Sequence, residues 1–110
     1  MNYSNDRRGV LVLFFDLPVV SKEDRYNYRT FKRAIKLLGY VQWQEFVYIK
    51  IVHNISSFPI ELQALRNIVP SNGQVDALPI NINVFKKLQE LGGTEDNNRL
   101  NDITDDIIFV

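Results

Sequence analysis

The sequence has no cysteine and a single histidine, and these two shortages exclude several kinds of chemistry. Without cysteine there is no disulfide, no thiolate metal site and no thiol nucleophile. His53 stands alone in the expected turn after the third strand, so a catalytic triad or a multi-histidine metal site within one chain has little support. Gly-rich phosphate loops, nucleophile elbows and zinc-ligand spacings are also missing. We therefore interpret His53 as an exposed loop residue.

A long apolar stretch and a net charge are missing as well. The apolar run from Val10 to Phe15 is much shorter than a signal-peptide core or a membrane span, and we expect a cytoplasmic protein without membrane contact. The 13 Lys and Arg residues balance the 13 Asp and Glu residues, so the whole chain carries no field that attracts a polyanion. A nucleic-acid role therefore requires positive charge to be segregated locally.

The length and the apolar content fit one folded unit. Apolar residues make up 45% of the 110 residues, as expected for an ordinary globular domain rather than a disordered chain. At this size a second copy often completes the core, so we expect a homodimer. We divide the chain into a folded domain, residues 1–93, and a C-terminal tail, residues 94–110.

The order of predicted elements indicates an α+β fold. In chain order, the patterns predict a strand over 9–15, a helix over 21–38, two strands within 40–52 with a bend at 44–45, a helix over 57–69, a strand over 74–80 and a short helix over 83–91. Strand, helix, two strands, helix, strand is the ferredoxin-like order, βαββαβ. The prediction is a ferredoxin-like sandwich with an additional C-terminal helix and a terminal strand.

Local signals fix the ends of these elements. Ser21, with Asp24 three residues later, resembles a capping box at the start of the first helix, and Gly39 follows its end. Ser57 is the expected cap of the second helix, and Pro79 marks the strand over 74–80 as terminal or at a sheet edge. The first helix is expected to cover the sheet with Tyr28, Phe31, Ala34, Ile35, Leu37 and Leu38.

A line of cations runs along the first predicted helix. Arg25, Arg29, Lys32 and Lys36 recur at helical spacing, with Arg33 beside them. Such a ridge suits contacts with phosphates, which require positive charges on a rigid element and no base code. The alternative is a solvated helix face whose long side-chain stems shelter apolar surface.

Asp16 follows the first strand, where side chains commonly face a cleft beside a rigid sheet. The alternative is a turn or cap residue before Leu17 and Pro18. A single carboxylate is a poor magnesium site, because Mg²⁺ prefers octahedral oxygen ligation. Two Asp16 carboxylates facing each other across a dimer axis could hold one Mg²⁺ ion and lower the pKa of a bound water for attack on a phosphodiester.

Two groups of apolar side chains could serve either the fold or contacts with a partner. Trp43, Phe46 and Tyr48 could stack on bases, but on a half-buried ribbon such aromatic residues are more often core or dimer contacts. The chain ends in an apolar run that looks like a terminal strand without a partner in its own chain. We expect this run to add to a sheet edge in another copy or another protein, through Ile107, Ile108, Phe109 and Val110.

Together these segments resemble a known family, the small CRISPR-associated protein 2. The resemblance spans nearly the whole chain and depends on the order and spacing of several pieces rather than on one motif. They are VLVLFFDLP over 10–18, YRTFKR over 28–33, GYVQWQEFVY over 39–48 and VDALPI over 75–80, followed by Phe85 and Gly92-Gly93. The start FDLP and the ending DDIIFV over 105–110 look like the form found in type II systems.

The resemblance implies a homodimer of ferredoxin-like subunits that bridges two dimers of the CRISPR integrase and supports a DNA duplex between them. Some members of the family are described as magnesium-dependent endonucleases, for which Asp16 would be the metal ligand and catalytic residue. The terminal run Ile107 to Val110 would dock the integrase or enter the neighbouring sheet. The chain lacks the arginines that some members carry after the first strand, since Leu17-Pro-Val-Val20 stands there, and it has Glu45-Phe46 where the family has a small hydroxyl residue.

Three functions therefore compete at this stage. The leading hypothesis is a scaffold and duplex-DNA-binding subunit of the spacer-acquisition complex. The second is a magnesium-dependent endonuclease of RNA or DNA that uses Asp16. The third is a small regulatory dimer that binds a metabolite at the sheet edge and does not contact nucleic acid.

Overall fold

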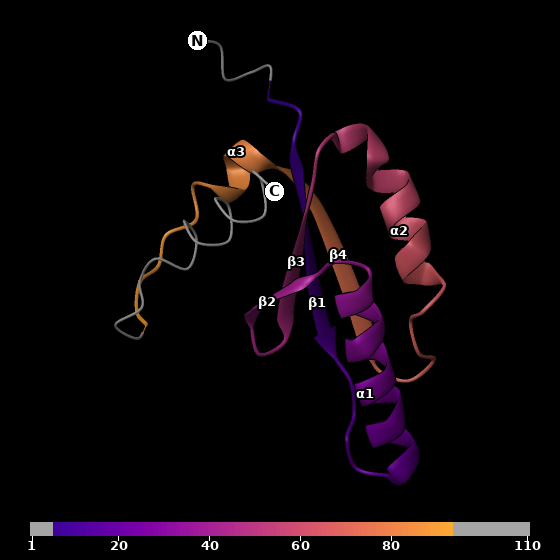
Figure 1. Ribbon diagram of the computed structural model, residues 1–110. Coiled ribbons are helices and arrows are strands. Elements are labelled where there is room, and N and C mark those ends of the chain that lie inside the picture. Colours follow the sequence, from indigo (N-terminus) through magenta and orange to yellow (C-terminus); the bar gives the residue numbers. More distant parts are fainter. Residues whose placement is uncertain (1–5, 94–110) are drawn as a thin grey trace.

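The computed structural model describes residues 6–93, in which helices α1 and α2 cover one face of a four-stranded antiparallel sheet (Figure 1). The elements are β1 (Gly9–Asp16), α1 (Lys22–Leu37), β2 (Val41–Gln44), β3 (Val47–Val52), a 3₁₀ turn η2 (Ile55–Ser57), α2 (Phe58–Arg66), β4 (Gln74–Asn81) and α3 (Ile82–Phe85). The strand order is β2-β3-β1-β4. This α+β arrangement is consistent with the predicted ferredoxin-like fold. The predicted terminal strand, with the rest of the 94–110 tail, lies outside the described residues.

β1 lies between β3 and β4 and contributes side chains to both faces of the sheet. Leu11, Leu13 and Phe15 point toward α1 and α2, and the Phe15 ring packs edge-on against Phe31 with the ring centroids 5.2 Å apart. The alternate residue Val12 belongs to a second apolar cluster on the other face. Because most of β1 is buried on both faces, its sequence is a continuous apolar run rather than an alternating one.

Helix α1 begins and ends as its sequence predicts. The Ser21 hydroxyl accepts a hydrogen bond from the Asp24 amide at 3.0 Å, and the Asp24 carboxylate accepts one from the Ser21 amide at 3.1 Å. These bonds lower the pKa of Asp24. Gly39 follows the helix with φ of +100°, a conformation that favours glycine. The assignment of Leu37 to the buried face is wrong: it is 82% exposed, because it lies about 120° around the helix from Phe31.

The two later helices are shorter than predicted. α2 ends at Arg66 rather than near Val69, because the amides of Ile68 and Val69 both turn back to the Leu65 carbonyl. Ser57 makes no capping hydrogen bond with its side chain; its hydroxyl instead donates to the Asn54 carbonyl at 2.7 Å. α3 has four residues and ends well before the glycines that were expected to close it.

The remaining expectations for the sheet are confirmed. A register shift between Gln42 and Gln44, and a turn over Glu45 and Phe46, separate β2 from β3 where the bend was predicted. In the described residues β4 pairs with β1 alone, so it is an edge strand and tolerates Pro79. α3 lies on the sheet face opposite α1 and α2, which leaves much of that face to the apolar cluster around Val12 (Figure 1).

Candidate functional site

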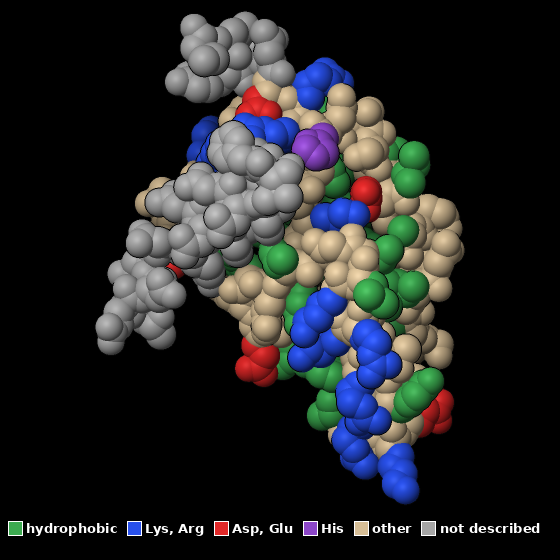
Figure 2. All heavy atoms as spheres, viewed as in Figure 1, with side chains coloured by type: hydrophobic (Ala, Val, Ile, Leu, Met, Phe, Trp, Pro, Cys, Tyr) green, Lys and Arg blue, Asp and Glu red, His purple; other side chains and the backbone are tan. Residues whose placement is uncertain are grey.

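The five cations of the first helix form a basic ridge along α1: Arg25, Arg29, Lys32, Arg33 and Lys36. Four of them are exposed and Lys32 is half-buried, and Figure 2 shows Lys and Arg side chains gathered in a row over this helix. Neither ion pair found in the described part of the chain, Asp6–Arg8 or Lys50–Glu61, includes a ridge cation. The sequence-predicted segregation of positive charge is therefore present on the surface.

The helix that carries the ridge, α1, is anchored to the sheet. Phe31 and Ile35, on the opposite side of α1, are 1% and 0% exposed and anchor the helix to the sheet. The Lys32 Nζ atom lies 5.2 Å from the centroid of the Tyr28 ring, a cation–π contact that restrains the ammonium group. A shallow depression of about 330 Å³ is lined by Tyr28, Arg29, Lys32, Arg33 and Lys36. Four cations therefore line one shallow depression on a helix that is anchored to the sheet.

Arg25, at the N-terminal end of the ridge, also makes contacts within the protein. Its Nη1 atom donates to the Val20 carbonyl at 2.7 Å and lies 3.4 Å from the Val19 carbonyl. These carbonyls belong to the loop that joins β1 to α1. Arg25 therefore holds that loop against the helix, whereas no comparable contact is found for Arg29 within residues 6–93.

Asp16 lies on the other side of the sheet from the ridge. It is the last residue of β1, it is exposed, and it stands opposite Gln74 on β4. Because side chains alternate along a strand, Asp16 shares the face of Phe14, which points away from α1 and α2. The ridge, in contrast, is carried by α1, which packs on the sheet face of Leu13 and Phe15.

A second carboxylate, Asp76, lies close to Asp16 in the sheet. Asp76 stands opposite Phe14, so it is diagonal to Asp16 on the neighbouring strand, and it accepts a hydrogen bond from Gln74 at 3.2 Å. Within residues 6–93 no group of three or more His, Cys, Asp or Glu side chains is placed to hold a metal ion. The described residues of one chain therefore do not fit a magnesium site, and pairing of Asp16 across a dimer stays a prediction.

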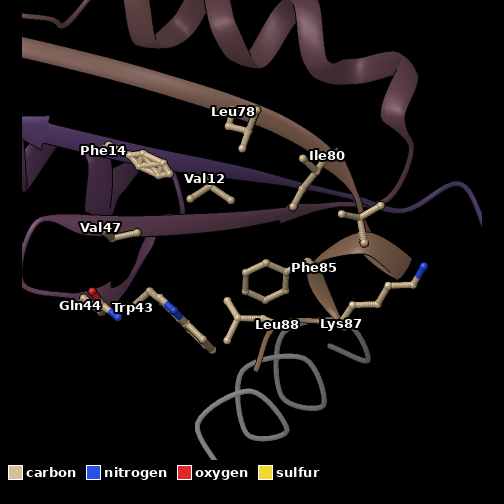
Figure 3. A pocket seen from close by; sticks show the side chains of 11 residues that line it. Val12, Phe14, Trp43, Gln44, Val47, Leu78, Ile80, Phe85, Lys87 and Leu88 are labelled. Carbon is tan, nitrogen blue, oxygen red and sulfur yellow. The ribbon is translucent and has the colours of Figure 1, made fainter. Parts of the chain in front are cut away.

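The sheet face opposite α1 and α2 contains an apolar hollow of about 460 Å³ that the sequence did not reveal. Figure 3 shows its walls: Val12, Phe14, Trp43, Val47, Leu78, Ile80, Phe85 and Leu88. Trp43 is 6% exposed and packs against Phe85 at 5.3 Å between ring centroids. At the margin, Phe14, Leu78 and Val84 remain 37%, 50% and 54% exposed. We call this surface the open apolar face.

The other candidate residues have simpler roles. Trp43 and Tyr48 are buried, which confirms the core interpretation of these aromatic side chains, while Phe46 stays 47% exposed in the turn between β2 and β3. His53 is exposed in the bend after β3, as predicted. None of the helices found in residues 6–93 is long and apolar enough to cross a membrane.

Comparisons with known proteins point to one family. No protein-family model matches the chain. A protein of Treponema denticola named CRISPR-associated endoribonuclease Cas2 is 29% identical over 100 residues, which cover 91% of this chain and 97% of the relative. Proteins with the same name from Acidovorax ebreus and Lacticaseibacillus rhamnosus are 36% and 32% identical over 83 and 85 residues, covering 81% and 84% of the relatives. These similarities agree with the resemblance indicated by the sequence segments.

Proposed function

Because the chain belongs to the Cas2 family of CRISPR-associated proteins, we propose that it is the scaffold and duplex-DNA-binding subunit of a CRISPR spacer-acquisition complex. In this role a homodimer bridges two dimers of the CRISPR integrase and supports the prespacer duplex between them. The observation that carries the proposal is the basic ridge on α1. It offers exposed, rigidly mounted cations that lack carboxylate partners among the described residues.

The dimensions of the ridge suit a duplex backbone. From Arg29 to Lys36 the helix rises by about 10 Å, at roughly 1.5 Å per residue. One DNA strand places a phosphate about every 3.4 Å along the helix axis, so this part of the ridge lies within reach of roughly three phosphates. Contacts of this kind read charge and shape rather than sequence, which fits a subunit that has to accept many different spacers.

The open apolar face supports the homodimer. A surface that leaves Phe14, Leu78 and Val84 partly exposed around an apolar hollow is costly to keep in water. A second copy packed against this face would bury these side chains. Pairing through this face also leaves α1 on the outside of each subunit, so the two basic ridges would stay free for DNA.

The complex itself provides the test of the scaffold role. The protein is mixed with the integrase encoded beside it and a short duplex, and the mass of the assembly is measured by light scattering. We expect a mass that corresponds to one dimer of this chain between two integrase dimers. A mixture in which this chain elutes apart from the integrase and the duplex would contradict the proposal.

A second candidate function is a magnesium-dependent endonuclease that cleaves RNA or DNA. The names of the relatives, which describe them as endoribonucleases, favour this candidate together with the exposed position of Asp16 at the end of β1. A single chain does not supply a metal-binding group within its described residues. Activity would therefore require the Asp16 carboxylates of two copies, and cleavage would be lost when either the carboxylate or the dimer is lost.

A further inference from the structure

One cation of the basic ridge differs from the other four in its surroundings. Lys32 is half-buried, whereas the other four are exposed. Its Nζ atom lies 5.2 Å from the centroid of the Tyr28 ring, and Tyr28 stands four residues earlier on the same side of α1. Within residues 6–93 no ring contact of this kind involves another ridge cation. Lys32 is therefore the ridge cation whose side chain is restrained by an aromatic neighbour.

The Tyr28 ring is itself held by the core. It packs edge-on against Phe15 with the ring centroids 6.3 Å apart, and Phe15 in turn contacts the rings of Phe31 and Tyr48 at 5.2 and 5.5 Å. These three rings are buried, while Tyr28 is half-buried and also lines the depression on α1. Tyr28 is thus the outermost ring of an aromatic cluster that extends from the core to the ridge.

We propose that Tyr28 is a positioning residue for DNA binding, whose ring holds the Lys32 ammonium group, before the duplex arrives, where it meets a backbone phosphate. This inference rests on the proposed function, since the basic ridge is the DNA-binding surface in both. Tyr28 does not have to contact the duplex itself, because it acts through Lys32.

A lysine that is already held binds a phosphate at a lower entropic cost. The stem of a free lysine side chain is long and flexible, and it loses this freedom when the ammonium group contacts a phosphate. The Tyr28 ring covers one side of the Lys32 ammonium group, so N–H donors stay available for phosphate oxygens. Lys32 also lies between Arg29 and Lys36 in the depression, about 4.5 Å and 6 Å from them along the helix axis. A phosphate bound by Lys32 therefore has another cation on either side.

Duplex affinity tests the positioning role of the ring. Tyr28→Leu keeps an apolar side chain beside Phe15, and we expect it to bind duplex about two- to fivefold more weakly at low salt, the factor that corresponds to one exposed cation–π contact. Tyr28→Phe keeps the ring and should bind like the parent. Tyr26→Leu is the matched control, because Tyr26 is exposed on the same helix and does not line the depression. Parental affinity of Tyr28→Leu, or a Tyr28→Phe variant that is equally weak, would overturn the inference.

A double-mutant cycle shows whether Tyr28 acts through Lys32 or through the fold of the helix. Tyr28→Leu is introduced into the parent and into a Lys32→Gln variant, and the duplex affinity of each product is compared with that of its own background. We expect the loss of affinity to disappear in the Lys32→Gln background, because no ammonium group is left for the ring to hold. Equal losses in the two backgrounds would overturn the inference.

The contact between Tyr28 and Lys32 can also be measured in the parent protein, so this test does not depend on the stability of a variant. The face of an aromatic ring shields protons that lie over it. We therefore expect the proton signals of the Lys32 methylene group next to the ammonium group to lie upfield of those of Lys36. Signals of Lys32 at the position of those of Lys36 would overturn the inference.

The proposed function and this inference can fail separately. If Arg29→Gln with Lys32→Gln leaves duplex binding unchanged, the proposed DNA-binding surface is wrong. If that variant weakens duplex binding and Tyr28→Leu binds like the parent, the surface stands and the positioning role of Tyr28 is wrong.

Discussion

The Nη1 atom of Arg25 donates a hydrogen bond to the Val20 carbonyl at 2.7 Å, which ties the first cation of the basic ridge to the loop after β1. The Arg25 guanidinium group therefore holds the backbone of this loop and also contributes positive charge to the surface. Substituting Arg25 would therefore disturb the loop and the surface charge together. Arg29 and Lys32 separate these effects better, because they line the depression on α1 and the hydrogen bonds to the loop carbonyls come from Arg25.

The first prediction concerns the homodimer. Phe14→Asp together with Leu78→Asp places two charges on the open apolar face, where a second copy would have to bury them. We expect this variant to sediment as a folded monomer at concentrations where the parent is a dimer. Leu37→Asp is the matched control, since Leu37 is 82% exposed on α1 and lies away from that face. A parent that sediments as a monomer would contradict the proposed interface.

The second prediction concerns Gly73, which lies just before β4 and packs against the backbone at the end of β1. Gly73 has a φ of +90°, and an added Cβ atom would lie 2.6 Å from Leu17 Cδ2 and 2.8 Å from the Asp16 carbonyl oxygen. We expect Gly73→Ala to lower the free energy of unfolding by about 1–3 kcal/mol, measured by urea denaturation. Gly92→Ala is the control, because among the described residues no heavy atom beyond its chain neighbours lies within 4 Å of the added Cβ. Equal stability of both variants would contradict this packing.

The third prediction is a pH dependence. Arg8 donates to both carboxylate oxygens of Asp6, at 2.9 and 2.6 Å, and these hydrogen bonds lower the pKa of Asp6 to about 2. Because this pKa is lower in the folded state than in the unfolded state, the pair stabilises the fold above about pH 4 and is lost as the pH falls toward 2. We expect Asp6→Asn to cost less than about 1 kcal/mol at pH 7, as for other partly exposed pairs.

Urea denaturation of the parent and the Asp6→Asn variant at several pH values checks this expectation. The difference in the free energy of unfolding should narrow between about pH 4 and pH 2, because protonation of Asp6 breaks the same pair in the parent. A difference that stays constant over this range would show that the pair with Arg8 is not its source.

The fourth prediction separates the two candidate functions. Asp16→Asn keeps the shape of an exposed side chain at the end of β1 and removes its charge. If the chain is a nuclease, magnesium-dependent cleavage of RNA or DNA should fall to background while the sedimentation of the dimer is unchanged. Asp76→Asn tests the diagonal neighbour in the same assay. Cleavage that survives Asp16→Asn would show that Asp16 is not the catalytic residue.

Local signals made much of this fold predictable from the sequence. The capping box of Ser21 and Asp24, the glycine after α1 and the edge position of Pro79 each depend on a few neighbouring residues, and the structure confirms all three. The errors concern how far an element continues and which of its apolar residues face the core. α2 ends early because the amides of Ile68 and Val69 share the Leu65 carbonyl, and Leu37 is exposed although it belongs to the apolar residues of α1.

The candidate site was likewise predictable only in part. The basic ridge follows from helical spacing alone, so the sequence predicted the position of Arg29 and Lys32 on α1. Asp76 could not be recognised as a neighbour of Asp16, because their proximity depends on the antiparallel register of β1 and β4. The open apolar face combines residues from four strands and α3, and no local pattern reveals which apolar side chains stay uncovered.

Duplex affinity measured over a range of salt concentrations tests the role of the basic ridge most directly. Arg29→Gln with Lys32→Gln is compared with the parent and with a control carrying Arg7→Gln and Arg66→Gln, which loses the same charge from other elements. We expect the ridge variant to bind more weakly and to lower the slope of log affinity against log salt by about 2, since each lost phosphate contact removes roughly one released ion. The control should retain the parental slope. A ridge variant with the affinity and the slope of the parent would contradict DNA binding by α1.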